Sequence, residues 1–248
     1  MVAQTSQRVF PRARAFVGVV GPDAEDYLQR MLSNDVAALG VGQACLALLL
    51  TPKARIIAPV RVVRRGVEDF LLSTEPELGE RVAGELARVR FAAKCEIRAE
   101  EHEAWHVVGG DEVVDERPEG DEVSAEEAER ARIEAGVPRW GAELDDTILP
   151  AEAGLDETHI SFTKGCYPGQ EPIARLHHRG HVNRRLRVLE VESGQPGDEI
   201  EYQGKTVGRI TSAVPGLALG YVRREVPDDA ALSVRGAAAR LHLSPARP

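Results

Sequence analysis

Residues 164–171 read KGCYPGQE, which is the most unusual segment of the chain. Two glycines and a proline among eight residues predict a tight loop of defined conformation around Cys166. Lys164, and Arg175 further on, are positive charges that would favour the thiolate form of this cysteine. The thiolate is the form that acts as nucleophile, redox centre or metal ligand. Packing alone rarely needs such a loop, so Cys166, with Lys164 beside it, is the first candidate functional group.

The other two cysteines have structural surroundings. Cys45 opens the apolar run CLALLL and Cys95 lies in FAAKCEI. Both runs predict buried strands in which a thiol acts as a small hydrophobic group. None of the three cysteines belongs to a CxxC pair, so we expect neither a disulfide framework nor a structural zinc site.

Histidines follow the loop, and residues 177–181 read HHRGH. They leave a Cys–His hydrolase open as one alternative, although no established nucleophile signature accompanies them. Adjacent histidines point apart in a strand, and the arginine and glycine disfavour a helix, so we predict no metal site. Neither a Walker-type loop nor a GxGxxG turn occurs, which leaves nucleotide-dependent chemistry without support.

Composition narrows the class of protein. The 248 residues are 43% hydrophobic and 29% charged, as expected of a soluble protein that divides into two or three units. No apolar run approaches the roughly 20 residues of a membrane span. The N-terminus lacks the apolar stretch of a secretory signal, so we expect a cytoplasmic protein without a membrane partner. The formal charge of -9 argues against a nucleic-acid partner, whereas the basic segments 53–65 and 164–187 suit a small anionic ligand.

The first half of the chain alternates helical and strand-like patterns. Apolar residues recur at helical spacing from Pro22 to about Ser33, and again over 78–89. Strand-like runs predict an antiparallel meander followed by further strands, over 45–50, 55–65, 69–72, 91–97 and 104–110. The acidic stretch 111–122 is polar and turn-rich, which predicts a surface connection.

A capping box at Ser124–Glu127 opens the next predicted helix, which ends at Gly136. Glu134 therefore lies in the last helical turn, where a carboxylate meets the negative end of the helix dipole. This position suggests that Glu134 serves a purpose other than stability. From Arg185 onward, short strand-like runs at regular spacing predict a small β-barrel, and the Ala-Arg-rich end is short enough to be a frayed terminus.

Two nearly contiguous stretches carry a family resemblance. Residues 164–180 resemble the KGCYxGQE signature of the YgfZ family, and residues 131–155 resemble the corresponding stretch of glycine-cleavage T-proteins and their folate-binding relatives. The likeness continues through residues 21–36 and 204–212, so it covers most of the chain. The KGCYxGQE segment is the most specific of these signals.

The resemblance implies an α+β fold of the glycine-cleavage T-protein type, in which units form a ring around a central folate pocket, with a small C-terminal β-barrel. On this reading, residues 1–40 and 124–180 form the folate-binding unit. Residues 41–123 form an inserted unit of antiparallel sheet plus helix, and residues 181–248 form the barrel.

The resemblance also implies candidate cofactor-binding residues for tetrahydrofolate or a folate derivative. Proteins of this superfamily hold the pterin with a glutamate in an R-x-E-x-G stretch, which is residues 132–136 here and makes Glu134 the candidate. A carboxylate that accepts two N–H groups is a charge-assisted, bidentate contact. Asn34 and Asp35 are secondary candidates for the same pocket, with turn or capping chemistry as their equally supported alternative.

One departure separates two possible activities. T-proteins carry an acidic pair in a stretch resembling GGxIDD, and the aligned residues 54–59 place Ala58 and Pro59 there. Neither side chain can exchange a proton, which weighs against the alternative of a folate-dependent aminomethyltransferase or demethylase. Resemblance to YgfZ implies instead a tetrahydrofolate-binding accessory protein for assembly, maintenance or repair of iron–sulfur enzymes, using the motif cysteine. Its expected partners are iron–sulfur client enzymes or the assembly machinery.

Overall fold

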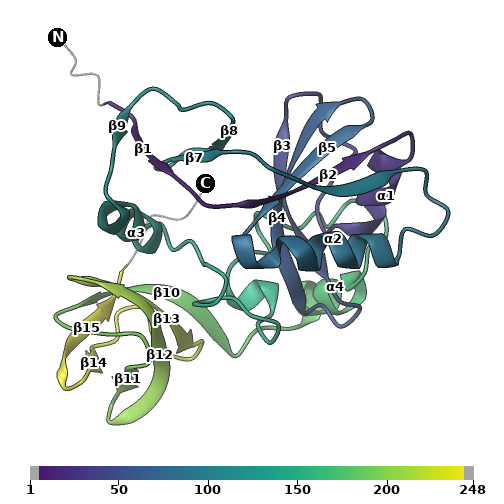
Figure 1. Ribbon diagram of the computed structural model, residues 1–248. Coiled ribbons are helices and arrows are strands. Elements are labelled where there is room, and N and C mark those ends of the chain that lie inside the picture. The colour runs from purple at the N-terminus through teal and green to yellow at the C-terminus, as the bar shows by residue number, and fades with distance from the viewer. Residues whose placement is uncertain (1–5, 243–248) are drawn as a thin grey trace.

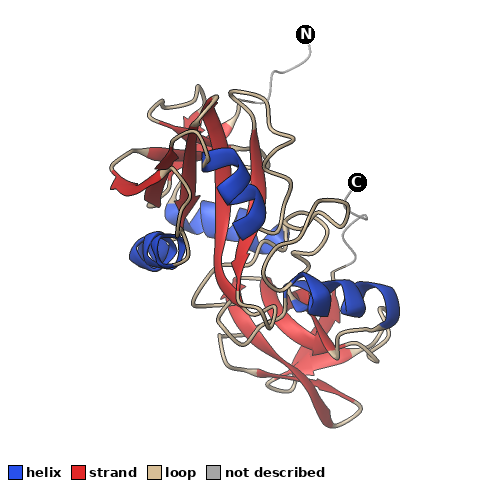
Figure 2. Cartoon of the chain, turned by 90° about the vertical axis from the view of Figure 1, so that its right-hand side faces the viewer, coloured by secondary structure: helices blue, strands red, loops and turns tan. Residues whose placement is uncertain are grey.

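The protein is built from a five-stranded sheet, a four-stranded sheet, a closed β-barrel and helices that lie against them (Figure 1). The structure is a computed structural model that describes residues 6–242. The barrel and the five-stranded sheet occupy opposite ends of the molecule (Figure 2). None of the helices in residues 6–242 is long and apolar enough to cross a membrane.

The five-stranded sheet is antiparallel throughout, in the order β3-β4-β5-β2-β6. Its strands are β2 (Ala15–Val20), β3 (Ala44–Leu50), β4 (Ile56–Gly66), β5 (Asp69–Thr74) and β6 (Glu96–Glu100). The predicted meander of β3, β4 and β5 is confirmed. The strand predicted from residue 91 is wrong at its start, because Phe91 has a positive φ of 46° and the regular strand begins only at Glu96.

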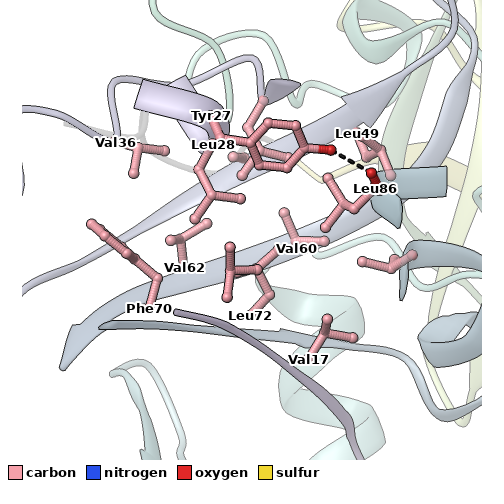
Figure 3. Close-up of a cluster of buried hydrophobic side chains, with 14 of the residues drawn as sticks. Val17, Tyr27, Leu28, Val36, Leu49, Val60, Val62, Phe70, Leu72 and Leu86 are labelled. Carbon is pink, nitrogen blue, oxygen red and sulfur yellow. Dashed lines mark hydrogen bonds between the residues drawn. The ribbon is translucent and has the colours of Figure 1, made fainter. Parts of the chain in front are cut away.

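Two helices cover this sheet. They are α1 (Ala24–Met31) and α2 (Gly79–Arg88), the latter preceded by a 3₁₀ turn at Pro76–Leu78. Figure 3 shows side chains of α1 and α2 meeting those of the sheet in a cluster of buried residues that includes Val17, Leu28 and Leu72. The Tyr27 hydroxyl donates to the Leu86 carbonyl at 2.5 Å, which links the two helices. The cluster makes the end of α1 a fixed support for the loops beside it.

The four-stranded sheet joins distant parts of the chain in the order β8-β7-β1-β9. Its strands are β1 (Arg8–Pro11), β7 (Ala104–Val107), β8 (Glu112–Val114) and β9 (Asp121–Glu122). Two of them lie in the acidic stretch that the sequence predicted to be a mere connection. Glu112 in this stretch is buried and accepts hydrogen bonds from Arg14 at 2.6 Å and Ser73 at 2.5 Å. Burial of this carboxylate is possible because an arginine compensates its charge.

Helix α3 (Ala125–Glu134) begins with the predicted capping box, in which Ser124 and Glu127 exchange hydrogen bonds. The barrel follows further on and is closed in the order β10-β13-β12-β11-β14-β15. Its strands are β10 (Arg184–Val191), β11 (Glu199–Tyr202), β12 (Lys205–Val214), β13 (Leu217–Arg223), β14 (Leu232–Val234) and β15 (Ala237–Leu241). The predicted C-terminal barrel is confirmed.

The prediction of a frayed Ala-Arg-rich end is wrong for residues 237–241. They form β15, which pairs with both β14 and β10 and so closes the barrel. Residues 243–248 of that end, like residues 1–5 of the N-terminal stretch searched for a signal, lie outside the described part of the chain. The domain boundaries near residues 40, 123 and 180 stay a prediction.

Helix α4 (Gln170–Arg179) contradicts the prediction that HHRGH could not be helical. Pro172 lies in its first turn, where a missing N–H costs nothing, and the glycine that seemed to break the helix is Gly180, just past its end. His177, His178 and Arg179 occupy the last turn, where positive charge suits the helix dipole.

Candidate functional site

The KGCYPGQE loop is held against the turn between β3 and β4. Gly169 has a φ of +86°, and a Cβ atom there would lie 2.7 Å from the carbonyl oxygen of Thr51 and 3.1 Å from Cα of Ala54. Only glycine combines this conformation with such a close approach. Tyr167 is buried in a cluster with Leu48 and other residues of the β3–β4 hairpin. The hairpin therefore fixes the C-terminal half of the loop.

Lys164 fixes the other half. Its side chain is buried, and Nζ donates to the backbone carbonyl oxygens of Gln29 at 2.5 Å, Leu32 at 2.7 Å and Asn34 at 2.9 Å. The last carbonyls of a helix lack partners within the helix, so the ammonium supplies the missing donors at the end of α1. Burial lowers the pKa of Lys164 to about 8, against the opposing influence of Asp35.

The contacts of Lys164 give it a structural role besides the predicted effect of its charge on Cys166. Its three hydrogen bonds link the loop to the C-terminal end of α1. The thiol whose titration responds to its charge is Cys45, because burial raises the pKa of Cys45 to about 11 while Lys164 opposes that rise. A direct effect of Lys164 on Cys166 stays a prediction.

Asn34 and Asp35 are half-buried and lie just after α1, where Lys164 binds. The Asn34 amide donates to the carbonyl of Leu46 at 2.7 Å and to that of Thr158 at 3.3 Å, and its Oδ1 accepts the Asp35 N–H at 2.9 Å. Asp35 accepts a hydrogen bond from Gln29 at 2.9 Å. These contacts are turn chemistry that joins α1, β3 and the segment before the motif loop. Whether the two residues also line a folate pocket stays a prediction.

Cys166 is exposed on this loop. In the described part of the chain, no hydrogen bond joins its Sγ to a histidine, so the structure contains no preformed Cys–His pair. His177 and His178 contact other aromatic rings. Phe162 stacks on His177 with ring centroids 4.0 Å apart, and His177 meets His178 edge-on. The arrangement presents a solvent-accessible thiol on a loop that is fixed on both sides.

Glu134 is the exposed last residue of α3. Among residues 6–242, no hydrogen bond or ion pair engages its carboxylate. Its motif neighbour Arg132 is heavily engaged, donating to Glu129 at 2.8 Å, Glu143 at 2.9 Å and Ser212 at 2.8 Å. Burial works against the charge of Arg132, but these carboxylates outweigh it and raise the pKa of the guanidinium.

Glu143 is a structural residue that the sequence did not indicate. Its side chain is fully buried and accepts hydrogen bonds from Ser212 at 2.6 Å and from the Arg139 N–H at 3.0 Å. Its carbonyl accepts the Tyr221 hydroxyl at 2.8 Å. Because Ser212 and Tyr221 belong to the barrel, this network joins α3 to β12 and β13. A polar residue in an acidic stretch gives no sequence signal of such burial.

The predicted site residues thus form two groups. Lys164, Asn34 and Asp35 meet at the end of α1, beside the loop that carries Cys166. Glu134 belongs to α3, which lies over the barrel and on the other side of Figure 1 from α1 and α4.

Comparison with known proteins supports the fold. A solved structure described as glycine cleavage system aminomethyltransferase T from Bartonella henselae matches with a TM-score of 0.81 at 18% identity, covering 96% of this chain and 85% of that one. The family model for the CAF17 C-terminal beta-barrel domain matches residues 183–248. The predicted α+β fold of the T-protein type is confirmed.

Relatives match over most of this chain and over most of their own length. An uncharacterized protein of Haemophilus influenzae is 30% identical over 232 residues, which are 80% of this chain and 81% of that protein. The tRNA-modifying protein YgfZ of Edwardsiella ictaluri is 25% identical over 92% of this chain and 88% of its own length. The iron-sulfur cluster assembly factor IBA57 homolog of Pyricularia oryzae is 25% identical over 92% of this chain and 74% of its own. The chain belongs to the CAF17/YgfZ/IBA57 family.

Membership in the CAF17/YgfZ/IBA57 family confirms the resemblance drawn from the KGCYxGQE segment. In this member, the residues aligned with the acidic pair of T-proteins are built into the sheet. Ala58 is fully buried in the core between the sheet and its helices, and the Pro59 carbonyl accepts the Thr74 hydroxyl at 2.7 Å. A carboxylate at position 58 would have to be buried among apolar side chains, which is costly.

Proposed function

We propose that this chain is a tetrahydrofolate-binding accessory protein that supports iron–sulfur enzymes through the thiol of Cys166, in the cytoplasm. Support comes from the family and from the relatives named for iron–sulfur cluster assembly and for tRNA modification. Neither name is that of an enzyme acting on a small substrate alone. A protein partner, an iron–sulfur client or part of the assembly machinery, is therefore part of the proposal.

The observation that carries the proposal is the exposure of Cys166 on an otherwise fixed loop. Lys164 on one side and Gly169 on the other bind the loop to α1 and to the β3–β4 hairpin. A thiol needed only for packing would be covered, as Cys95 is. A thiol held outward on a rigid support is arranged to meet another molecule.

The chemistry of a thiolate suits iron–sulfur clients. Thiolates are the soft ligands that hold iron in such clusters. A single cysteine cannot retain a cluster, so the remaining ligands come from the client or the partner, and the cluster is cargo. This reading also agrees with the absence of a Cys166–histidine hydrogen bond in the described residues, which leaves the hydrolase alternative without a general base at the thiol.

The folate component rests on Glu134. Its carboxylate is exposed and unengaged within residues 6–242, so both oxygens are available to accept N–H groups of a pterin. Arg132, which holds the end of α3 in place, orients that carboxylate indirectly. A bound tetrahydrofolate would supply one-carbon or redox chemistry. Aminomethyl transfer is not part of the proposal, since Ala58 and Pro59 offer no group that exchanges a proton.

The test is Cys166→Ser in cells that contain no other copy of the protein. Serine keeps the shape of the side chain but stays protonated at neutral pH and is a poor ligand for iron. We expect the activity of an iron–sulfur enzyme in these cells to fall to the level without the protein, while the Tm of the purified variant is unchanged.

Cys95→Ser is the matched control. This thiol is buried in the core, so a hydroxyl there should cost about 1–3 kcal/mol of stability and leave the iron–sulfur enzyme active. The opposite pattern for Cys166→Ser, a lowered Tm with retained enzyme activity, would show that Cys166 is structural and reject the proposal.

A further inference from the structure

Four arginines line the end of the barrel at which β10 begins and β13 ends. Leu189 and Val191 of β10 point into the barrel core. Side chains alternate along a strand, so Arg185 and Arg187 lie on the same inward face, beyond the end of the core. The register agrees, because Arg185 pairs with Val222 of β13, which is itself a core residue. Two arginines therefore continue the inward row to the mouth of the barrel.

The mouth is a hollow of about 290 Å³ with an apolar floor and a charged rim. Val222 and Val226 are buried and form the floor, and Arg223 and Arg224 complete the rim. A second hollow of about 400 Å³, lined by residues 181–183 and Glu225, shares Arg224 with the first. The Arg224 N–H donates to the Asn183 carbonyl at 2.9 Å, so a hydrogen bond joins the linings of the two hollows.

The charge at the rim is only partly compensated. Arg187 pairs with Asp228 at 2.8 Å and Arg223 with Glu225 at 3.5 Å. Arg185 and Arg224 form no ion pair within residues 6–242. The four arginines face two carboxylates, an excess of positive charge in a protein whose formal charge is -9. The segment 172–189, which contains Arg185 and Arg187, has three further arginines, three histidines and no Asp or Glu.

We propose that the barrel mouth binds a small multivalent oxyanion through Arg185 and Arg224. Guanidinium groups present planar forks that match phosphate and carboxylate oxygens, and barrel mouths are frequent ligand sites. Two arginines without an ion-pair partner in the described part of the chain fit a ligand with at least two anionic groups. The acidic remainder of the protein disfavours a long polyanion, which would extend past the rim. The site is independent of the proposed folate site.

Calorimetric titration of the whole protein with pyrophosphate and with citrate tests the site and separates a phosphate ligand from a carboxylate ligand. In low salt we expect saturable binding of one anion per chain, weakened by added sodium chloride. Tighter binding of either probe supports the site and identifies the preferred group. Arg185→Glu/Arg224→Glu should weaken binding at least about tenfold, since two charge-assisted contacts are lost.

Arg209→Glu is the matched control, because Arg209 is exposed on the same barrel and does not line the mouth. It should bind the probes as the wild type does. Arg185→Gln/Arg224→Gln, which removes charge without reversing it, covers the case in which the glutamate variant misfolds. No saturable binding of either probe to the wild type, undiminished binding by the glutamine variant, or equal weakening by Arg209→Glu would overturn the proposal.

Discussion

The motif loop at residues 164–169 and the end of α3 at residues 132–136 are built on the same plan but anchored to different parts of the molecule. In each, a cation fixes the backbone, buried in the case of Lys164 and half-buried in the case of Arg132, and a neighbouring functional candidate faces solvent. Lys164 binds the carbonyls at the end of α1, within the part formed by the five-stranded sheet. Arg132 binds Glu143 and Ser212, and so the barrel.

Because the two candidates are anchored to different parts of the molecule, we expect the two proposed activities to be separable. The thiol loop depends on α1 and the β3–β4 hairpin, whereas the carboxylate of Glu134 depends on the junction of α3 with the barrel. A substitution that breaks the contacts of one candidate should leave the contacts of the other intact, because the stability effects of distant substitutions with no shared partners are additive.

The largest loss of stability is expected from Arg132→Met. The variant leaves the fully buried carboxylate of Glu143 without its cation, which should cost about 3–5 kcal/mol in the free energy of unfolding. Arg132→Met/Glu143→Gln is the control, since the glutamine can be buried without a charge and should recover part of the loss. Urea unfolding of the three proteins measures this, and equal losses in the single and double variants would contradict the role of the ion pair.

A smaller but more local loss is expected from Gly169→Ala. A Cβ atom would meet backbone atoms of Thr51 and Ala54, and the left-handed φ of +86° adds strain. We expect a loss of at least about 2 kcal/mol and a displaced Cys166 loop. Gly165→Ala is the control, because its Cβ would meet no atom within 4 Å. If thermal unfolding shows the same effect for both variants, the hairpin does not fix the loop.

The third effect is a difference in pH response between the two cations. Burial lowers the pKa of Lys164 to about 8 from an ordinary 10.5, whereas Arg132 keeps its charge. Between pH 8 and 10.5 the unfolded chain therefore holds a proton on Lys164 that the folded chain has released, so stability rises with pH in this window. Below pH 8 both states are protonated and this contribution is constant.

Comparison with Lys164→Met isolates this titration. The free energy of unfolding of the wild type minus that of the variant should increase from pH 8 to 10.5 and stay level from pH 6 to 8. Urea unfolding of both proteins at each pH measures the difference. A difference that falls above pH 8 would mean that the three carbonyls hold the ammonium more strongly than burial opposes it.

Much of the fold could be predicted because local signals agreed with the final structure. The capping box at Ser124, the meander of β3 to β5 and the regular strand spacing after Arg185 depend on short-range patterns. Helix α4 contradicts its prediction because Pro172 in the first turn and Arg179 in the last turn favour a helix, and Gly180 lies just past its end. Those signals were present in the sequence.

The remaining features depend on contacts that no local pattern carries. Lys164 was expected to act on Cys166 because they are close in sequence, but its donors point to α1, far away along the chain. Glu143 and Glu112 read as solvated acids, and only their tertiary partners show why they are buried. Strand β15 has a composition typical of a terminus, and pairing with β10 on closing the barrel decides its structure.

Calorimetric titration of tetrahydrofolate into the wild type, Glu134→Ala and Glu126→Ala tests the proposed folate site directly. The wild type should bind saturably, and Glu134→Ala should lose about 2–4 kcal/mol of binding free energy, or roughly 30- to 1,000-fold in affinity, with an unchanged Tm. Glu126→Ala removes an exposed carboxylate at the other end of α3 and should bind as the wild type does. Equal affinities for all three proteins, or no binding by the wild type, would contradict the proposed folate site.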